Sequence, residues 1–521
     1  MLVHEFLENS TYRDPSKEAL ICEAGRYKYQ DIAQKSDAIM KLLLGSGLKK
    51  SDRVIIWLPN SLETAVSIFG ILQAGGIMVV VNHQVKPDKL RYIINDCTAK
   101  VLITDKQHFV DFKPELDHCK NLDTVVLTDE KNEKILSTNK KEIQIIPFAK
   151  EILGKFENLA PPQIIDVDLA AIIYTSGSSG FPKGALFTHQ NMVSAASSII
   201  EYLENVPEDI IYNVLPLSFD YGLYQLLMAF KFGGTLVLDR NINYPYHNLK
   251  KINNEHITGF PIVPAIANIL LKMNHLKEYN LKSLRYITNT GQRLPKSTIY
   301  GLREAFPGVK IYSMYGLTEC KRVSYLPPEK LDQKPGSVGQ AMPNTEAFII
   351  DENGDRIEEA GEIGELVVRG ASMMVEYWKN PEATSKVIKE GKMPGDRWLY
   401  TGDLFQRDED GDLYFYGRKD DIIKKLGEKV SPREIESVLY KLDGISEAAV
   451  IGIPDEITGK TIVAVVSLEE DSGLQERDII QHCKNYLESF KIPKYIDIRS
   501  SLPLNPNGKF DKKRLVAAHQ S

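Results

Sequence analysis

The residues best suited to chemistry form one short run from Tyr174 to Gly184, which reads Tyr-Thr-Ser-Gly-Ser-Ser-Gly-Phe-Pro-Lys-Gly. Glycines let the backbone fold back and point successive N–H groups at an anion. Hydroxyls can add hydrogen bonds to phosphate oxygens, and a lysine can supply a point charge. The residues that offer these groups are Thr175, Ser176, Gly177, Ser178, Ser179, Gly180 and Lys183. The run therefore predicts a cradle for the phosphates of a nucleoside triphosphate.

The flanks of this run predict ordered elements on both sides. Ala171–Ile173 is apolar and β-branched, as in a buried strand, and a helical pattern begins at Thr188. We therefore expect a strand-to-helix connection rather than a Ser/Gly linker, because linkers rarely lie between such elements. The run is not a Walker A loop, since Pro182 precedes Lys183 and Gly184 follows it. The kinase motif set is absent too, which argues against a kinase or an ATP hydrolase.

The run resembles the phosphate-binding signature of the adenylate-forming superfamily, which includes acyl-CoA synthetases, peptide-synthetase adenylation domains and luciferases. Ser179 stands where that family usually has Thr, which keeps the hydroxyl. Further segments match the family in its order along the chain, so the resemblance covers nearly all of the chain, which is similar to bacterial AMP-dependent acyl ligases. It implies ATP-dependent activation of a carboxylic acid to acyl-AMP, release of pyrophosphate, and transfer of the acyl group to a phosphopantetheine thiol.

The resemblance gives the residues of Tyr315–Glu319 roles at the nucleotide. Tyr315 would pack against adenine beside Gly316, Thr318 would reach the α-phosphate, and Glu319 would help to hold Mg²⁺. An aromatic face can stack on a base, and a hard cation prefers carboxylate oxygen.

Three further residues, Asp403, Arg418 and Gly291, complete the nucleotide site that the resemblance implies. Asp403 would accept both ribose hydroxyls, which the acceptor capacity of one carboxylate allows. Arg418 would also contact the ribose. Gly291 would lie at adenine and at the floor of the acyl pocket, although its segment, Asn289–Pro295, departs from the usual Gly-Gly followed by Glu or Ala.

Near the C-terminus, Lys509 matches the family lysine that catalyses adenylation. A cation is needed there because negative charge gathers where the carboxylate oxygen meets the α-phosphate. Asp420 matches the hinge residue about which the small domain rotates. Gly427 would then leave room for the phosphopantetheine arm.

Phe219 and Asp220 are the residues that indicate the class of carboxylic acid to be activated. In amino-acid-activating relatives an Asp at this place pairs with the substrate ammonium, whereas fatty and aromatic acyl-CoA synthetases more often carry Phe-His. A carboxylate facing a cation is a sound basis for such selection. Asp220 could equally cap the helical pattern Leu223–Phe230. Both interpretations stay open.

The thiol acceptor is expected to be free coenzyme A, or a carrier protein in trans because the chain has no carrier signature of its own. The alternative enzyme is a standalone amino-acid adenylating enzyme that loads such a carrier. A non-enzymatic nucleotide-binding protein would need no catalytic lysine, and the joint presence of Lys509, Asp420 and Glu319 argues against it.

The organisation of the chain suits these roles. The first ~415 residues alternate β-branched runs with helical patterns, which predicts an α/β fold with parallel-rich sheets. A polar stretch with glycines at both ends, Gly417–Gly427, follows as a hinge. Ser431–Glu434 then has the form of a capping box with Pro at the first helical position. We expect a large N-terminal adenylate-forming domain over 1–417 and a small α+β C-terminal lid domain over 418–521.

Composition narrows the partners. The net charge is −6, from 64 basic and 70 acidic residues, which predicts no general attraction to nucleic acid or anionic membranes. No apolar run approaches the ~20 residues that span a bilayer, and the N-terminus lacks a signal-peptide core. The five cysteines form no C-x-x-C pair and are odd in number. We therefore expect a reduced, cytoplasmic enzyme.

Overall fold

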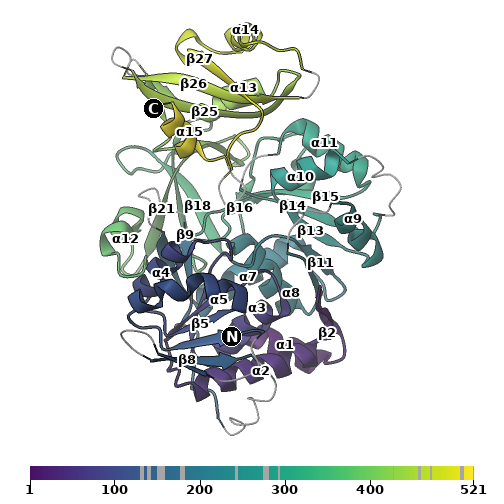
Figure 1. Cartoon of the computed structure of the whole chain (residues 1–521). Helices are drawn as coiled ribbons and strands as arrows, with labels where there is room; N and C mark the ends of the chain where they lie inside the picture. Colours follow the sequence, from purple (N-terminus) through teal and green to yellow (C-terminus); the bar gives the residue numbers. More distant parts are fainter. Residues whose placement is uncertain are drawn as a thin grey trace.

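The computed structural model describes residues 1–129, 134–137, 142–148, 159–175, 182–240, 245–273, 281–291, 294–425, 428–455, 459–469, 472–504 and 510–519. Within these ranges the chain forms two large sheets, a smaller antiparallel sheet and a C-terminal unit (Figure 1). This is the mixed α/β architecture, with a large N-terminal part and a smaller C-terminal part, that the sequence predicts.

The first large sheet has the strand order β10-β9-β4-β3-β5-β6-β8-β7 and is parallel from β9 to β8. Its central strand β3 (Arg53–Trp57) is almost wholly buried, as expected for a parallel strand covered on both faces. The others are β4 (Ile77–Val80), β5 (Val101–Thr104), β6 (Thr124–Leu127), β7 (Lys134–Ser137), β8 (Glu142–Pro147), β9 (Leu169–Thr175) and β10 (Lys183–Thr188).

The second large sheet has the order β17-β16-β15-β14-β13-β11-β12-β1-β2. Strands β12, β11, β13, β14 and β15 run parallel, so their carboxyl ends lie at one edge. Its strands are β1 (Glu18–Cys22), β2 (Gly25–Lys28), β11 (Ile210–Asn213), β12 (Thr235–Leu238), β13 (Gly259–Ile262), β14 (Tyr286–Asn289), β15 (Lys310–Tyr315), β16 (Ser324–Leu326) and β17 (Gln340–Ala341).

Two helices pack between these two sheets. α7 (His189–Leu203) packs on β9 and β10, whereas α8 (Asp220–Phe232) packs on β11, β12 and α7. Both therefore lie between the sheets (Figure 1). α8 is buried nearly all round, which its apolar residues allow. The other helices here are α1 (Glu5–Arg13), α2 (Tyr29–Gly45), α3 (Leu62–Gln73), α4 (Pro87–Asp96), α5 (Lys106–Phe112), α9 (Pro245–Asn254), α10 (Pro264–Leu271) and α11 (Lys296–Ala305).

The smaller sheet carries the last motifs of the large domain. The long strand β21 (Arg397–Arg407) pairs antiparallel with β19, β20 and β22. Its companions are β18 (Thr345–Ile350), β19 (Gly364–Gly370), β20 (Ile388–Glu390) and β22 (Leu413–Arg418), with the short helix α12 (Pro381–Val387) beside them.

The C-terminal unit has apolar clusters of its own, which is why it is a separate α+β unit. In Figure 1 it forms the upper part of the molecule, beyond β18 and β21. Its elements are β23 (Ile423–Lys425), β24 (Glu428–Val430), α13 (Pro432–Leu439), β25 (Ile445–Asp455), β26 (Gly459–Leu468), α14 (Glu476–Tyr486), β27 (Tyr495–Arg499) and α15 (Lys512–Ala518).

The run from Tyr174 to Gly184 connects two strands, and the predicted strand-to-helix connection is wrong. β9 and β10 pair antiparallel with Thr175 opposite Lys183. α7 begins only after Thr188, whose hydroxyl caps it. The reason is that Ala185 and Phe187 are fully buried, so an apolar strand forms between the loop and the polar cap.

The predicted capping box of α13 is also wrong, although Pro432 does occupy the first helical position. Ser431 is the N-cap, but its hydroxyl donates to the Tyr416 carbonyl at 2.5 Å. Glu434 instead accepts from Lys491 Nζ at 2.7 Å. Both side chains of the expected box are therefore used by partners outside the helix.

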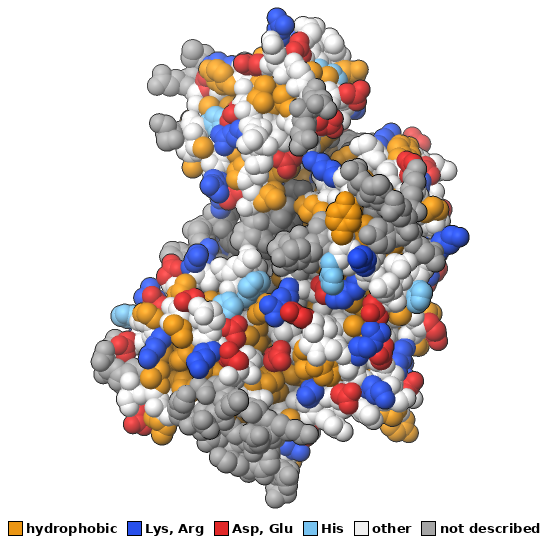
Figure 2. Space-filling view, turned by 45° about the vertical axis from the view of Figure 1, so that its right-hand side comes forward, with side chains coloured by type: hydrophobic (Ala, Val, Ile, Leu, Met, Phe, Trp, Pro, Cys, Tyr) orange, Lys and Arg blue, Asp and Glu red, His pale blue; other side chains and the backbone are white. Residues whose placement is uncertain are grey.

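The surface carries no single-sign field on the face shown in Figure 2, where acidic and basic side chains are interspersed. None of the described helices is long and apolar enough to cross a membrane. All five cysteines are buried and none is in a disulfide.

Candidate active site

Three predicted nucleotide-binding residues from separate motifs meet at one point. Tyr315 Oη donates to Asp403 Oδ2 at 2.6 Å, and Arg418 Nε lies 3.0 Å from Asp403 Oδ1. Asp403 is only 3% exposed. We call these three residues the ribose cluster. Each oxygen of the carboxylate is thus oriented by a different partner.

The elements explain this convergence. Tyr315 is the last residue of β15, at the carboxyl edge of the second sheet. Antiparallel pairing of β21 with β22 sets Asp403 directly opposite Arg418. The Asp403 carboxylate raises the pKa of Arg418. Burial and the same carboxylate raise the pKa of Tyr315, so its hydroxyl stays protonated and donates.

The segment after Tyr315 turns back tightly on itself. A Cβ at Gly316 would lie 2.1 Å from the carbonyl oxygen of Lys321, so only glycine fits there. Lys321 has φ of +66°, a left-handed conformation that lysine rarely adopts. Thr318 and Glu319 lie in this turn, between Tyr315 of the ribose cluster and Lys321, and both are half-buried.

Glu319 is held by a residue that the sequence analysis missed. Tyr377 Oη donates to Glu319 Oε1 at 2.6 Å, and the Met374 N–H donates to the Glu319 carbonyl at 2.7 Å. Lys183 Nζ lies 5.3 Å from the centre of the Tyr377 ring. Tyr377 thus contacts both Lys183, which belongs to the predicted phosphate loop, and the predicted magnesium ligand. No motif flagged it, because its sequence context shows no periodicity or catalytic spacing.

The donor set at this point suits a hard cation. Glu319 supplies a carboxylate and Thr318 a hydroxyl, and Mg²⁺ prefers oxygen ligands of this kind. Asp408, Asp410 and Asp412 also form a carboxylate group spaced for a cation. However, Lys334 Nζ lies 2.8, 2.6 and 2.6 Å from their oxygens and so occupies the place where a cation would bind.

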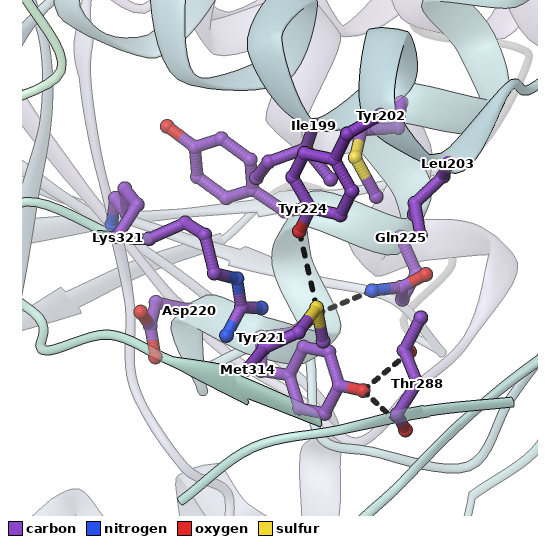
Figure 3. Close-up of a pocket in the computed structure, with 12 residues that line it drawn as sticks. Ile199, Tyr202, Leu203, Asp220, Tyr221, Tyr224, Gln225, Thr288, Met314 and Lys321 are labelled. Atoms are coloured by element: carbon purple, nitrogen blue, oxygen red, sulfur yellow. Dashed lines mark hydrogen bonds between the residues drawn. The ribbon is translucent and has the colours of Figure 1, made fainter. Parts of the chain in front are cut away.

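Asp220 is the first residue of α8, and the N-cap residue is Phe219, which makes no side-chain capping bond. The interpretation of Asp220 as the helix cap is therefore wrong: Asp220 lies in the first turn, where a negative charge still suits the helix dipole. Figure 3 shows Asp220 at a pocket whose other wall includes Tyr221, Tyr224, Thr288 and Lys321.

Two further predicted residues lie at turns. Gly291 follows β14 with φ of +89°, which favours glycine. Asp420 is exposed in the turn after β22, where the Lys419 N–H donates to the Gly402 carbonyl at 2.8 Å. The remaining predictions fall outside the described residues, namely Ser176, Gly177, Ser178, Ser179, Gly180, Gly427 and Lys509.

Comparison with known proteins gives a consistent result. A family profile described as AMP-binding enzyme matches residues 7–378, and one described as AMP-binding enzyme C-terminal domain matches 434–509. The long-chain-fatty-acid–CoA ligase of Bacillus subtilis (strain 168) is 30% identical, over 99% of this chain and 94% of that protein.

Solved structures agree over the whole length. The anthranilate CoA ligase AuaEII in complex with anthranoyl-AMP has a TM-score of 0.88 at 26% identity, covering 99% of this chain and 97% of that one. ATP-bound MatB from Rhodopseudomonas palustris has a TM-score of 0.87 at 26% identity, covering 100% and 99%.

Proposed function

The chain belongs to the AMP-binding enzymes, and on that premise we propose that it joins a carboxylic acid to a thiol in two steps. In the first, a carboxylate oxygen attacks the α-phosphorus of ATP, the bond to the β-phosphate breaks, and acyl-AMP and pyrophosphate form. In the second, the thiol sulfur attacks the acyl carbon and loses its proton, and AMP leaves. The observation that carries this proposal is the ribose cluster, in which Tyr315 and Arg418 both contact the buried carboxylate of Asp403.

The ribose cluster would hold the nucleoside. Asp403 accepts the ribose hydroxyls, Arg418 fixes the carboxylate and reaches the sugar, and the Tyr315 ring packs against adenine with Gly291 and Gly316 leaving room for the base. Arg418 stays ionised beside Asp403, because the carboxylate raises its pKa. The same pairing makes the cluster rigid before the nucleotide arrives, which lowers the cost of ordering on binding.

The phosphates would lie along the loop between Thr175 and Lys183. The groups that would bind the phosphates are the N–H and hydroxyl donors of residues 175–180, the Lys183 ammonium and the Thr318 hydroxyl. Mg²⁺ held by Glu319 would offset phosphate charge. Lys509 would lie between the carboxylate oxygen and the α-phosphate, where its charge offsets their repulsion in the transition state.

The hydroxyl of Tyr377 orients Glu319, so Tyr377→Phe should lower the kcat/KM of adenylation. One hydrogen bond to a charged group is worth ~1.5 kcal/mol, or about tenfold. The variant should also need more Mg²⁺ for half-maximal rate, measured as pyrophosphate release. Tyr414→Phe is the matched control, because Tyr414 Oη donates to Asp408 at 3.1 Å, another tyrosine–carboxylate pair. Equal rates in the two variants would contradict the role of Tyr377.

We propose coenzyme A as the thiol, with a carrier protein in trans as the alternative. CoA is favoured because the curated relative and the anthranoyl-AMP complex are both named CoA ligases. The proposed boundary between domains 1–417 and 418–521 lies at the end of β22, and the lid would rotate about Asp420 to bring Gly427 to the thiol. The cytoplasm is the proposed location, since reduced cysteines persist there.

Asp420→Pro should therefore separate the two half-reactions. Proline fixes φ near −65° and removes one soft dihedral from the hinge. Adenylation, measured as pyrophosphate exchange, should stay within a few-fold of wild type, while thioester formation from acyl-AMP falls about tenfold or more. Asp420→Ala keeps the backbone free and serves as the control. A proline variant that is normal in both steps would remove the hinge assignment.

The alternative function, amino-acid adenylation with loading of a carrier, rests on Asp220 at the pocket. ATP–pyrophosphate exchange with pairs of amino acids and their desamino analogues tests it. A wild-type enzyme that ignores the amino group would exclude Asp220 as an ammonium ligand, and exchange with some acid supports adenylation in either case. No exchange with any carboxylate, while ADP accumulates, would refute the proposed function.

A further inference from the structure

The pocket beside Asp220 contains two buried cations that the proposed reaction does not use. Lys321 and Arg322 are each 5% exposed, and both line this pocket. Lys321 Nζ and Arg322 Nε have no hydrogen-bond partner in the described part of the chain. The Tyr202 hydroxyl is hydrogen-bonded to Arg322, and the charge of the Asp220 carboxylate acts on Lys321, but a buried charge that is only partly compensated is costly. Their position therefore calls for a group that the free protein lacks.

Aromatic rings provide partial compensation. Lys321 Nζ lies 4.2 Å from the centre of the Phe187 ring and 5.2 Å from that of Tyr224. The Arg322 guanidinium carbon lies 5.3 Å from the centre of the Tyr221 ring. Such contacts stabilise a cation by less than the desolvation of an ion costs. The rings hold the cations in the pocket without neutralising them.

The charges in the pocket do not balance. Asp220 is the one carboxylate among the described lining residues, against two cations. The carboxylate that becomes adenylated cannot supply the difference, because it must meet the α-phosphate at Thr318, Glu319 and Lys509. A second negative charge on the substrate would balance the pocket. An added ammonium, as in a neutral amino acid, would increase the excess of positive charge.

The size of the pocket limits the length of the acid. The cavity measures about 10 Å³, which is room for roughly one water molecule. Ile199, Leu203 and Met228 also line it, and the buried Tyr224 hydroxyl has no hydrogen-bond partner among the residues that the structure describes. Figure 3 shows the polar groups of Asp220, Lys321 and Tyr221 around the same space. A long alkyl chain would have to displace these apolar lining residues and lie against two cations. A short polar acid needs only side-chain shifts, which are common on binding.

We propose that the substrate is a short dicarboxylic acid whose second carboxylate is bound by Lys321 and Arg322. This inference rests on the proposed function, and it makes these two residues the determinants of specificity.

Pyrophosphate exchange by the full chain tests the substrate class directly. Succinate, glutarate and adipate are compared with butanoate, pentanoate and hexanoate, which replace the second carboxylate by a methyl group, and with hexadecanoate. We expect kcat/KM for the best diacid to exceed that of its monoacid by about 10²-fold or more, because loss of the anion leaves buried charges unpaired. A monoacid or hexadecanoate as the best substrate would overturn the proposal. No exchange with any acid would refute the proposed function instead.

Variants test the two residues. Arg322→Met and Lys321→Met should each lower kcat/KM for the diacid about 10²-fold, mainly through KM, while the monoacid rate and the KM for ATP stay within a few-fold. Lys231→Met is the control, because Lys231 lies on α8 with Nζ 5.5 Å from the centre of the Phe6 ring. Equal losses with both acids would overturn the assignment. If thermal melting shows a Met variant unfolded, Arg322→Lys replaces it. The kcat/KM of Arg322→Lys should fall more for the diacid than for the monoacid, and equal losses, or a wild type without a preference for the diacid, would overturn the assignment.

Discussion

Replacing Lys509 by alanine is expected to lower the rate of adenylation by about 10²- to 10³-fold. The ammonium would offset charge that develops only as the carboxylate oxygen meets the α-phosphate, and such preorganised stabilisation is worth ~3–4 kcal/mol. Binding of ATP should change little, because the ribose cluster and the phosphate loop are untouched. Initial rates of pyrophosphate release at saturating substrates measure the effect.

The second half-reaction provides the internal control for Lys509. Transfer to the thiol from preformed acyl-AMP should largely survive in Lys509→Ala, since no carboxylate attacks phosphorus in that step. Lys512→Ala is the matched control in the same segment, because Lys512 Nζ pairs with Glu436 at 2.6 Å. Equal losses in both half-reactions would mean that Lys509 supports the fold and not the chemistry.

Replacing Asp403 by asparagine should raise the KM for ATP by about 10²-fold. An amide cannot accept two ribose hydroxyls while its NH₂ group faces Arg418, and losing hydrogen bonds to a charged group costs ~3 kcal/mol in total. The kcat at saturating ATP should fall less. Steady-state kinetics over a range of ATP concentrations separate the two effects.

The matched control for Asp403 is Asp396→Asn. Asp396 lies next to the start of the same strand and also joins an aromatic donor to an arginine, with Trp398 Nε1 at 3.0 Å and Arg369 Nε at 2.5 Å. It should leave the KM for ATP unchanged. A rise that is as large in Asp396→Asn as in Asp403→Asn would show a general effect on the sheet, and the ribose role would fail.

Much of the framework could be predicted from local sequence. Buried parallel strands such as β3 and β5 read as β-branched runs because both faces are covered. α3 ends before Gly75, whose φ of +71° suits glycine. The separate C-terminal unit was visible because the polar, glycine-flanked stretch interrupts the apolar pattern.

The sequence did not predict contacts that depend on the tertiary fold. Tyr377 reaches Glu319 across 58 residues of chain, and no local pattern connects them. Lys321 lines the pocket because a left-handed turn closes on Gly316, a conformation that propensity disfavours for lysine. Ser431 and Glu434 had the spacing of a capping box, yet partners outside the helix took both side chains.

The central claim is that the acid is activated as an acyl-adenylate, and oxygen transfer tests it most directly. An acid that supports exchange is labelled with ¹⁸O in its carboxylate and incubated with ATP, Mg²⁺ and coenzyme A, and the products are analysed by mass spectrometry. The account predicts that AMP carries one labelled oxygen from the acid and that pyrophosphate carries none. Unlabelled AMP, or label in inorganic phosphate together with ADP, would contradict it.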